Sequence, residues 1–125
     1  MNTIFLVFIG AGLGGVLRYV ISNGVYLLFK PNFPLGTLIV NISGCFLMGL
    51  LFIILLERFA QIGSELRAFI LIGMLGGYTT FSSFSIETIN LFENGDWLRA
   101  IINIFLSLGL CFAATWIGVV IGRNI

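Results

Sequence analysis

The chain has 125 residues, of which 59% are hydrophobic and 9% are charged, and its mean hydropathy is +1.15. Too few polar residues remain to cover a water-soluble globule of this length, so the composition excludes a soluble domain and favours a lipid bilayer. The net charge is +1 and the Lys and Arg residues are scattered, so we expect no nucleic-acid partner.

Four apolar runs are long enough to cross a bilayer, which takes roughly 20 residues for about 30 Å of hydrocarbon. They predict an all-α membrane protein in which residues 1–125 form a single, compact, four-helix transmembrane domain. The predicted spans are about residues 4–29, 35–56, 65–90 and 97–122.

The first span contains one charged residue, Arg18, past its midpoint. A long run with an internal charge differs from the short apolar core of a signal peptide, so we expect this span to stay in the mature protein. The Arg18 side chain can extend into an aqueous vestibule, where its charge would attract anions. A structural role, in which Arg18 bonds carbonyl groups at a helix C-terminus, is the alternative.

Short polar joints separate the spans, and their sequences are KPNFP, ERFAQIGSE and ENGDW. Proline, asparagine and glycine in these joints are typical of turns. Ser64 and Asp96 stand directly before the third and fourth spans, so we expect each to cap the helix that follows it.

Polar side chains form stripes on two of the spans. Thr37 and Asn41 are four residues apart on the second span and therefore share a helix face. The fourth span repeats polar or thiol residues at the same interval, at Asn103, Ser107, Cys111 and Thr115. A single hydroxyl can bond its own helix, but the amide of Asn41 has two donors and an acceptor that need partners inside a membrane.

The third span contains the stretch GGYTTFSSFSIE, residues 76–87, which is too polar for a simple membrane helix. Its glycines and β-branched threonines predict a helix that breaks midway, and such a break is tolerated only next to protein or a water-filled cavity. Phe81 and Phe84 follow the break on one face, beside Ser82 and Ser83. Ring edges are positively polarised, so rings, hydroxyls and the amide together would form a neutral donor environment that suits a small anion.

Cys45 and Cys111 both fall inside predicted spans. No CxxC spacing and no histidine accompany them, so we expect small buried apolar side chains rather than a disulfide or a metal pair. Without histidine we also expect no His-based catalysis, and no enzyme.

Three pairs of glycines are spaced by four residues, which permits close helix contact in lipid: Gly10 and Gly14, Gly73 and Gly77, and Gly118 and Gly122. Packing within the chain and packing between subunits are both open readings. The six Lys and Arg residues divide equally between the two membrane sides, so either insertion direction is expected. Four closely packed helices leave little room for an aqueous path, so transport would require at least a dimer.

Three segments carry a family resemblance: GAGLGGVLRY (residues 10–19), PLGTLIVNISGCFLMG (residues 34–49) and GMLGGYTTFSSFSIE (residues 73–87). They resemble the signature regions of the Fluc family of fluoride channels. The resemblance implies an antiparallel, dual-topology homodimer with two pores, which exports fluoride passively from the cytoplasm through the bacterial inner membrane. It also implies a structural sodium ion at the dimer centre.

By motif position, the resemblance implies pore roles for Asn41, Phe81 and Phe84, with Ser82 and Ser83 supplying hydroxyls beside the rings. It assigns the sodium-binding main-chain carbonyls to Gly76 and Thr79. Thr37 and Ser107, from the two polar stripes, are predicted to line the same pore. Asn103 departs from the family pattern, which often has tyrosine there.

Two other functions fit parts of the pattern. A proton-coupled exporter of small molecules, also four-helical and of dual topology, needs a carboxylate within the membrane, and Glu87 is the candidate. A membrane subunit that transports nothing would use the glycines and polar stripes for assembly alone. It would not explain two phenylalanines set among serines after a helix break.

Overall fold

Every regular element is a helix within residues 2–61 and 63–125, the part of the chain that the computed structural model describes. In chain order the elements are α1 (Thr3–Phe29), α2 (Leu35–Ile53), η1 (Ile54–Arg58), α3 (Ser64–Arg67), η2 (Ala68–Leu75), α4 (Gly76–Tyr78), α5 (Phe81–Glu93) and α6 (Trp97–Asn124), where η denotes a π-helical segment.

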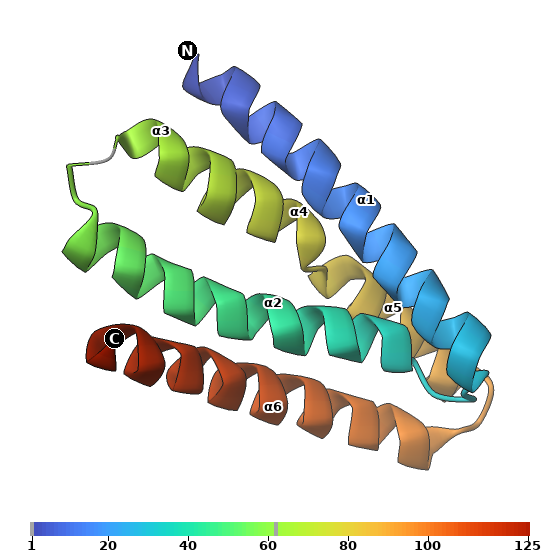
Figure 1. Ribbon diagram of the computed structural model, residues 1–125. Helices are drawn as coiled ribbons and strands as arrows, with labels where there is room; N and C mark the ends of the chain where they lie inside the picture. The colour runs from blue at the N-terminus through green and yellow to red at the C-terminus, as the bar shows by residue number, and fades with distance from the viewer. Residues whose placement is uncertain (1, 62) are drawn as a thin grey trace.

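Four continuous or nearly continuous helical runs have the length and apolarity needed to cross a membrane: Thr3–Phe29, Leu35–Arg58, Ser64–Glu93 and Trp97–Asn124. They confirm the four predicted spans, and the ends differ by at most a few residues. The two chain termini lie at the same end of the helices in Figure 1, as an even number of crossings requires. The chain is a multi-pass membrane protein by these criteria.

The two predicted N-caps have different outcomes. The Asp96 carboxylate accepts a hydrogen bond from the backbone N–H of Arg99 at 3.3 Å, so the cap of α6 is confirmed. Ser64 is instead the first residue of α3, and Gly63 precedes it with a positive φ of 26°. The cap prediction for Ser64 is wrong because the glycine, which tolerates this backbone angle, occupies the cap position.

Two glycine-lined seams hold the helices together. Along the first, α1 packs on η2 and α4, and a Cβ placed on Gly10 would lie 2.5 Å from the carbonyl oxygen of Phe69. Along the second, α2 packs on α6, where a Cβ on Gly118 would overlap the Phe46 carbonyl oxygen. The glycine pairs therefore serve packing within the chain, because no larger side chain fits at these crossings.

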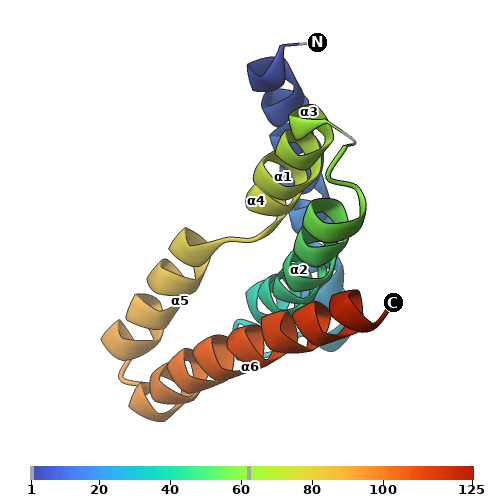
Figure 2. The same cartoon turned by 90° about the vertical axis from the view of Figure 1, so that its left-hand side faces the viewer.

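The third span does not complete a compact four-helix bundle. Thr79 and Thr80 have extended backbone angles, and they separate α4 from α5. Figure 2 shows α5 turning away from α4 and running toward the start of α6, whereas α1, α2 and α4 stay together. The predicted break is confirmed, but the compact bundle expected from the sequence is wrong, because the extended residues redirect the second half of the span.

Candidate functional site

Asn41 holds the break in the third span. Its side-chain amide donates to the carbonyl of Thr80 at 2.9 Å, and its Oδ1 accepts from the backbone N–H of Thr80 at 2.7 Å. A peptide group that has left the helix needs such partners inside a membrane, and here one side chain supplies both. An amide has two N–H groups, so the second donor of Asn41 is left for whatever enters beside it.

Hydroxyl groups stabilise the two helix ends at the break. Thr79 Oγ1 donates to the Leu75 carbonyl at 3.0 Å, which closes the last turn before the break. Thr80 Oγ1 accepts from the backbone N–H of Ser83 at 3.2 Å and so caps α5. The Ser83 and Ser82 hydroxyls lie 3.1 and 3.3 Å from Thr80 Oγ1, and Ser82 is otherwise exposed. The threonines and serines of the motif therefore shape the break as well as its surroundings.

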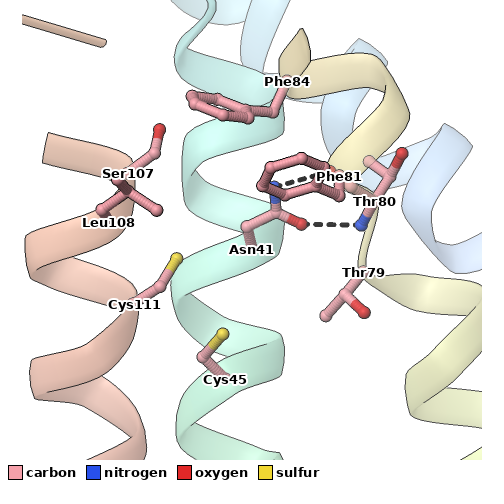
Figure 3. Close-up of a pocket in the computed structure, with 9 residues that line it drawn as sticks. All are labelled: Asn41, Cys45, Thr79, Thr80, Phe81, Phe84, Ser107, Leu108 and Cys111. Atoms are coloured by element: carbon pink, nitrogen blue, oxygen red, sulfur yellow. Dashed lines mark hydrogen bonds between the residues drawn. The ribbon is translucent and has the colours of Figure 1, made fainter. Parts of the chain in front are cut away.

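A cavity of about 220 Å³ lies next to the break, between α2, α5 and α6 (Figure 3), and we call it the break cavity. It is lined by Asn41, Cys45, Thr79, Thr80, Phe81, Phe84, Ser107, Leu108 and Cys111. The polar side chains are therefore neutral, and most of the wall is apolar.

Two phenyl rings form one wall of the break cavity. The centroids of Phe81 and Phe84 are 5.3 Å apart, and the ring planes are tilted by 53°. Phe84 is buried, with 8% of its surface exposed, whereas Phe81 is 70% exposed in the single chain. A tilted pair presents positively polarised ring edges as well as faces, so the wall can favour an anion without carrying a charge.

A second cavity, of about 340 Å³, also reaches Thr80, and we call it the arginine cavity. It is lined by Gly15, Arg18, Tyr19, Ser22, Asn23, Thr37, Thr80, Ser83 and Glu87. Thr80 lines both cavities, so the two cavities meet at the helix break.

The arginine cavity is lined by two charged side chains, Arg18 and Glu87. Thr37 Oγ1 donates to the Glu87 Oε1 at 2.7 Å, while Glu87 Oε2 has no hydrogen-bond partner within the described residues. The Arg18 guanidinium lies 3.5 Å from the Thr79 carbonyl oxygen. Thr37 and Asn41 share a helix face, but they open to different cavities, and Thr37 pairs with the carboxylate instead of lining the break cavity.

Asn103 connects α5 to α6, a role that spacing alone did not predict. It is 2% exposed, and its amide donates to Thr88 Oγ1 at 2.9 Å while its carbonyl oxygen accepts from Ser107 Oγ at 3.3 Å. Thr88 Oγ1 in turn donates to the Phe84 carbonyl at 2.7 Å. This chain of bonds ties the residue that carries a cavity ring to the residue that carries a cavity hydroxyl. A buried asparagine in an apolar span was the one sequence signal of such a role.

Comparisons with known proteins agree on one family. The family described as CrcB-like protein, Camphor Resistance (CrcB), matches residues 5–119. A curated protein of Coxiella burnetii named fluoride-specific ion channel FluC is 56% identical over 122 residues, which cover 98% of each chain. Proteins of the same name from Shewanella baltica and Methylococcus capsulatus are each 46% identical. The alignment with the Shewanella protein covers 94% of each chain. The alignment with the Methylococcus protein covers 98% of this chain but 54% of that longer relative.

The match extends across all four spans and includes every residue that lines the two cavities. Both the family match over most of the chain and the full-length similarity to the Coxiella protein lead to the same conclusion. The chain belongs to the CrcB-like protein family.

Proposed function

We propose that this chain is a fluoride-selective ion channel that lets fluoride leave the bacterial cytoplasm passively across the inner membrane. The observation that carries the proposal is the break cavity, where the amide of Asn41, the hydroxyl of Ser107 and two tilted phenyl rings surround one small space. The names of the relatives, fluoride-specific ion channels, support the choice of anion.

The chemistry of the break cavity supports conduction rather than tight binding. A full positive charge at this depth would bind an anion too strongly for it to leave, whereas neutral donors offer several weak bonds in sequence. Fluoride is small and can exchange its water shell for short hydrogen bonds. A path with few donors favours such an ion over larger anions, because a larger anion gains less from each hydrogen bond.

The functional unit of the proposal is an antiparallel homodimer with one pore for each chain. The equal division of Lys and Arg between the membrane sides supports insertion in both directions. The 70% exposure of Phe81 supports a second chain that covers this ring and completes the wall of the pore. In the proposed path, Ser82 and Ser83 supply hydroxyls beside the rings, and Arg18 attracts fluoride into the arginine cavity, which serves as the vestibule.

A structural sodium ion is proposed at the centre of the dimer, held by the main-chain carbonyls of Gly76 and Thr79. In an unbroken helix the Gly76 carbonyl would accept from the N–H of Thr80, but that N–H donates to Asn41 instead. The Thr79 carbonyl makes a long 3.5 Å contact with Arg18, which would have to release it when sodium binds. Two carbonyls from each chain would supply neutral oxygen ligands of the kind a hard cation prefers.

The decisive test of the function is fluoride efflux from liposomes that contain only this purified protein. We expect passive efflux that needs no proton gradient, measured with a fluoride electrode, and much slower chloride efflux. Fluoride retained at the rate of protein-free liposomes would contradict the proposal and would favour a subunit that transports nothing.

The proton-coupled exporter remains the alternative, because Glu87 Oε2 is buried beside a polar cavity and has no hydrogen-bond partner among the residues that the structure describes. Glu87→Gln distinguishes the two functions. In a channel, the substituted amide can still accept the hydrogen bond of Thr37 through its carbonyl oxygen, and fluoride efflux is expected to continue. An exporter would lose its proton carrier, so its transport would stop, and transport by the unmodified protein would collapse when the proton gradient is removed.

Sodium and dimer geometry can be tested separately from conduction. In sodium-free medium we expect slower efflux or a weaker dimer, with unchanged selectivity among anions. In antiparallel chains the termini of one chain lie on the membrane side opposite to those of the other, so cysteines at the termini should not crosslink to one another. A terminal cysteine should instead crosslink to a cysteine placed in the 30–34 or 94–96 joint of the other chain. Full efflux without sodium would remove the ion from the proposal, and crosslinking between parallel chains alone would remove the antiparallel dimer.

A further inference from the structure

The break cavity contains two thiols that the proposed fluoride path does not use. Cys45 on α2 and Cys111 on α6 both line it, and neither is in a disulfide. Both side chains therefore face the same space. In Figure 3 both sulfur atoms lie at the same end of the cavity, next to Asn41. The sequence predicted small buried apolar side chains at these positions, whereas the tertiary structure brings the two thiols, each only partly buried, to one cavity.

The close contact between α2 and α6 explains why the thiols meet. Gly49 lies one helical turn after Cys45, and Thr115 lies one turn after Cys111. A Cβ placed on Gly49 would overlap the Thr115 carbonyl oxygen, so the two backbones touch at this point. Cys45 and Cys111, one turn away on these two helices, both line the break cavity, so helices rather than a loop hold the thiols there.

From this geometry we propose that Cys45 and Cys111 form a two-thiolate site for a soft divalent cation that prefers two opposed ligands, as the mercuric ion does. On binding, each S–H bond breaks, each proton leaves to water, and two sulfur–metal bonds form. No oxidant or reductant is needed. Thiolate sulfur is the ligand that soft metal ions prefer.

The charge balance of the bound state also suits this environment. Two thiolates and one divalent cation form a neutral unit, so the complex avoids the cost of burying a net charge among apolar side chains. A soft monovalent cation would leave the same pair of thiolates with a net negative charge. Both cysteines are only partly buried in the single chain, so an ion in the cavity can reach them.

The site has a consequence for transport, and this step rests on the proposed function. A metal held between Cys45 and Cys111 would occupy part of the space that Asn41, Ser107 and the rings surround. We therefore expect the bound ion to block fluoride efflux from inside the pore.

Metal binding is measured first, by intact-protein mass spectrometry after brief exposure to HgCl₂ and washing with an excess of a monothiol. The unmodified protein should retain one mercury per chain, with the loss of two hydrogens. Cys45→Ser and Cys111→Ser should lose mercury to the monothiol, because tethering a second ligand typically strengthens binding by about 10²–10⁴-fold. Retention by either single variant, or mercury found bridging two chains, would overturn the site.

A matched control keeps two thiols and changes their placement. Leu110 is adjacent to Cys111 and 42% exposed, so Cys111→Ser combined with Leu110→Cys moves the second thiol off the cavity face. This variant should lose mercury like the single variants. If it retained the metal as the unmodified protein does, proximity in the break cavity would not be the cause of binding.

Efflux is then measured on the same samples, each compared with its own rate before mercury. We expect at least a tenfold loss in the unmodified protein and recovery when a dithiol removes the metal. Retained mercury with undiminished efflux would leave the binding site in place and overturn its position in the fluoride path. A protein that transports no fluoride would fail only this second measurement, so the two failures are distinguishable.

Discussion

The break cavity and the arginine cavity meet at Thr80 but hold different kinds of polar group. The break cavity has one amide, hydroxyls, thiols and phenyl rings, and all of these are neutral donors or apolar surfaces. The arginine cavity has a guanidinium and a carboxylate, and its volume of about 340 Å³ exceeds the 220 Å³ of the other. A charge can therefore attract an ion in the arginine cavity, while the neutral donors of the break cavity bind it weakly enough for it to leave.

One added negative charge should reduce fluoride efflux much more in the break cavity than in the arginine cavity. Asn41→Asp removes the donors to Thr80 and to the ion, and it places a carboxylate against the Thr80 carbonyl. We expect efflux from liposomes to fall by about 100-fold or more, because a lost charge-assisted bond and a new repulsion together exceed about 3 kcal/mol.

Asn23→Asp is the matched control for Asn41→Asp. Asn23 is a half-buried asparagine that lines the arginine cavity. Asn23 shares its cavity with the Arg18 guanidinium, whose charge can offset an added carboxylate, so we expect a loss of only a few-fold. Equal losses in the two variants would mean that the cavities do not differ in selectivity.

Loss of either ring should slow fluoride efflux by a similar factor, but loss of the two rings should lower the stability of the protein by different amounts. Phe81→Ile and Phe84→Ile each keep most of the volume and remove the ring edge, so we expect roughly tenfold slower efflux from each variant, since an aromatic pair contributes about 0.5–1.5 kcal/mol. Phe84 is buried within the chain and Phe81 is not, so Phe84→Ile should lower the thermal stability of the detergent-solubilised protein more. Efflux from both variants at the original rate would exclude the rings from the mechanism.

A smaller effect is expected from loosening the support of the break cavity. Asn103→Ala leaves Thr88 and Ser107 without a shared partner, and we expect the free energy of unfolding to fall by about 0.5–2 kcal/mol, with efflux slowed a few-fold. Asn124→Ala is the control, since Asn124 is exposed and bonds only the Val120 carbonyl of its own helix among the described residues. A denaturation series on both variants measures the difference, and equal stabilities would remove Asn103 as a positioning residue.

The smallest loss of efflux should come from removing the charge of Arg18 in the arginine cavity. Arg18→Gln keeps a donor but removes the charge, so efflux should slow by about two- to fivefold at low ionic strength, where screening reaches about 30 Å. The difference from the unmodified protein should shrink near physiological salt, where the screening length is about 8 Å. Arg99→Gln is the control, because Arg99 pairs with Asp96 at an exposed helix start. If the loss of efflux in Arg18→Gln did not depend on salt concentration, Arg18 would serve as a structural bond to Thr79 rather than attract anions.

The sequence by itself determined the membrane class, the four spans and the position of the helix break. These follow from local properties: long apolar runs cannot remain in water, and glycines beside β-branched threonines do not sustain a helix. The glycine pairs likewise indicated close helix contact, because only the absence of a Cβ permits it. The pore assignments of Asn41, Phe81 and Phe84 came from the family resemblance and remain predictions, although the structure brings these three residues to one cavity.

Only the tertiary structure decided which distant residues face one another. Thr37 and Asn41 share a helix face, yet Thr37 bonds Glu87 while Asn41 bonds Thr80, because the break separates their surroundings. The outward turn of α5, the link from Asn103 to Thr88 and the placement of Cys45 and Cys111 in one cavity depend on contacts between helices. Hydrophobic periodicity reports which face of a helix is apolar, but it does not report the partner, since many partners bury the same apolar surface equally well.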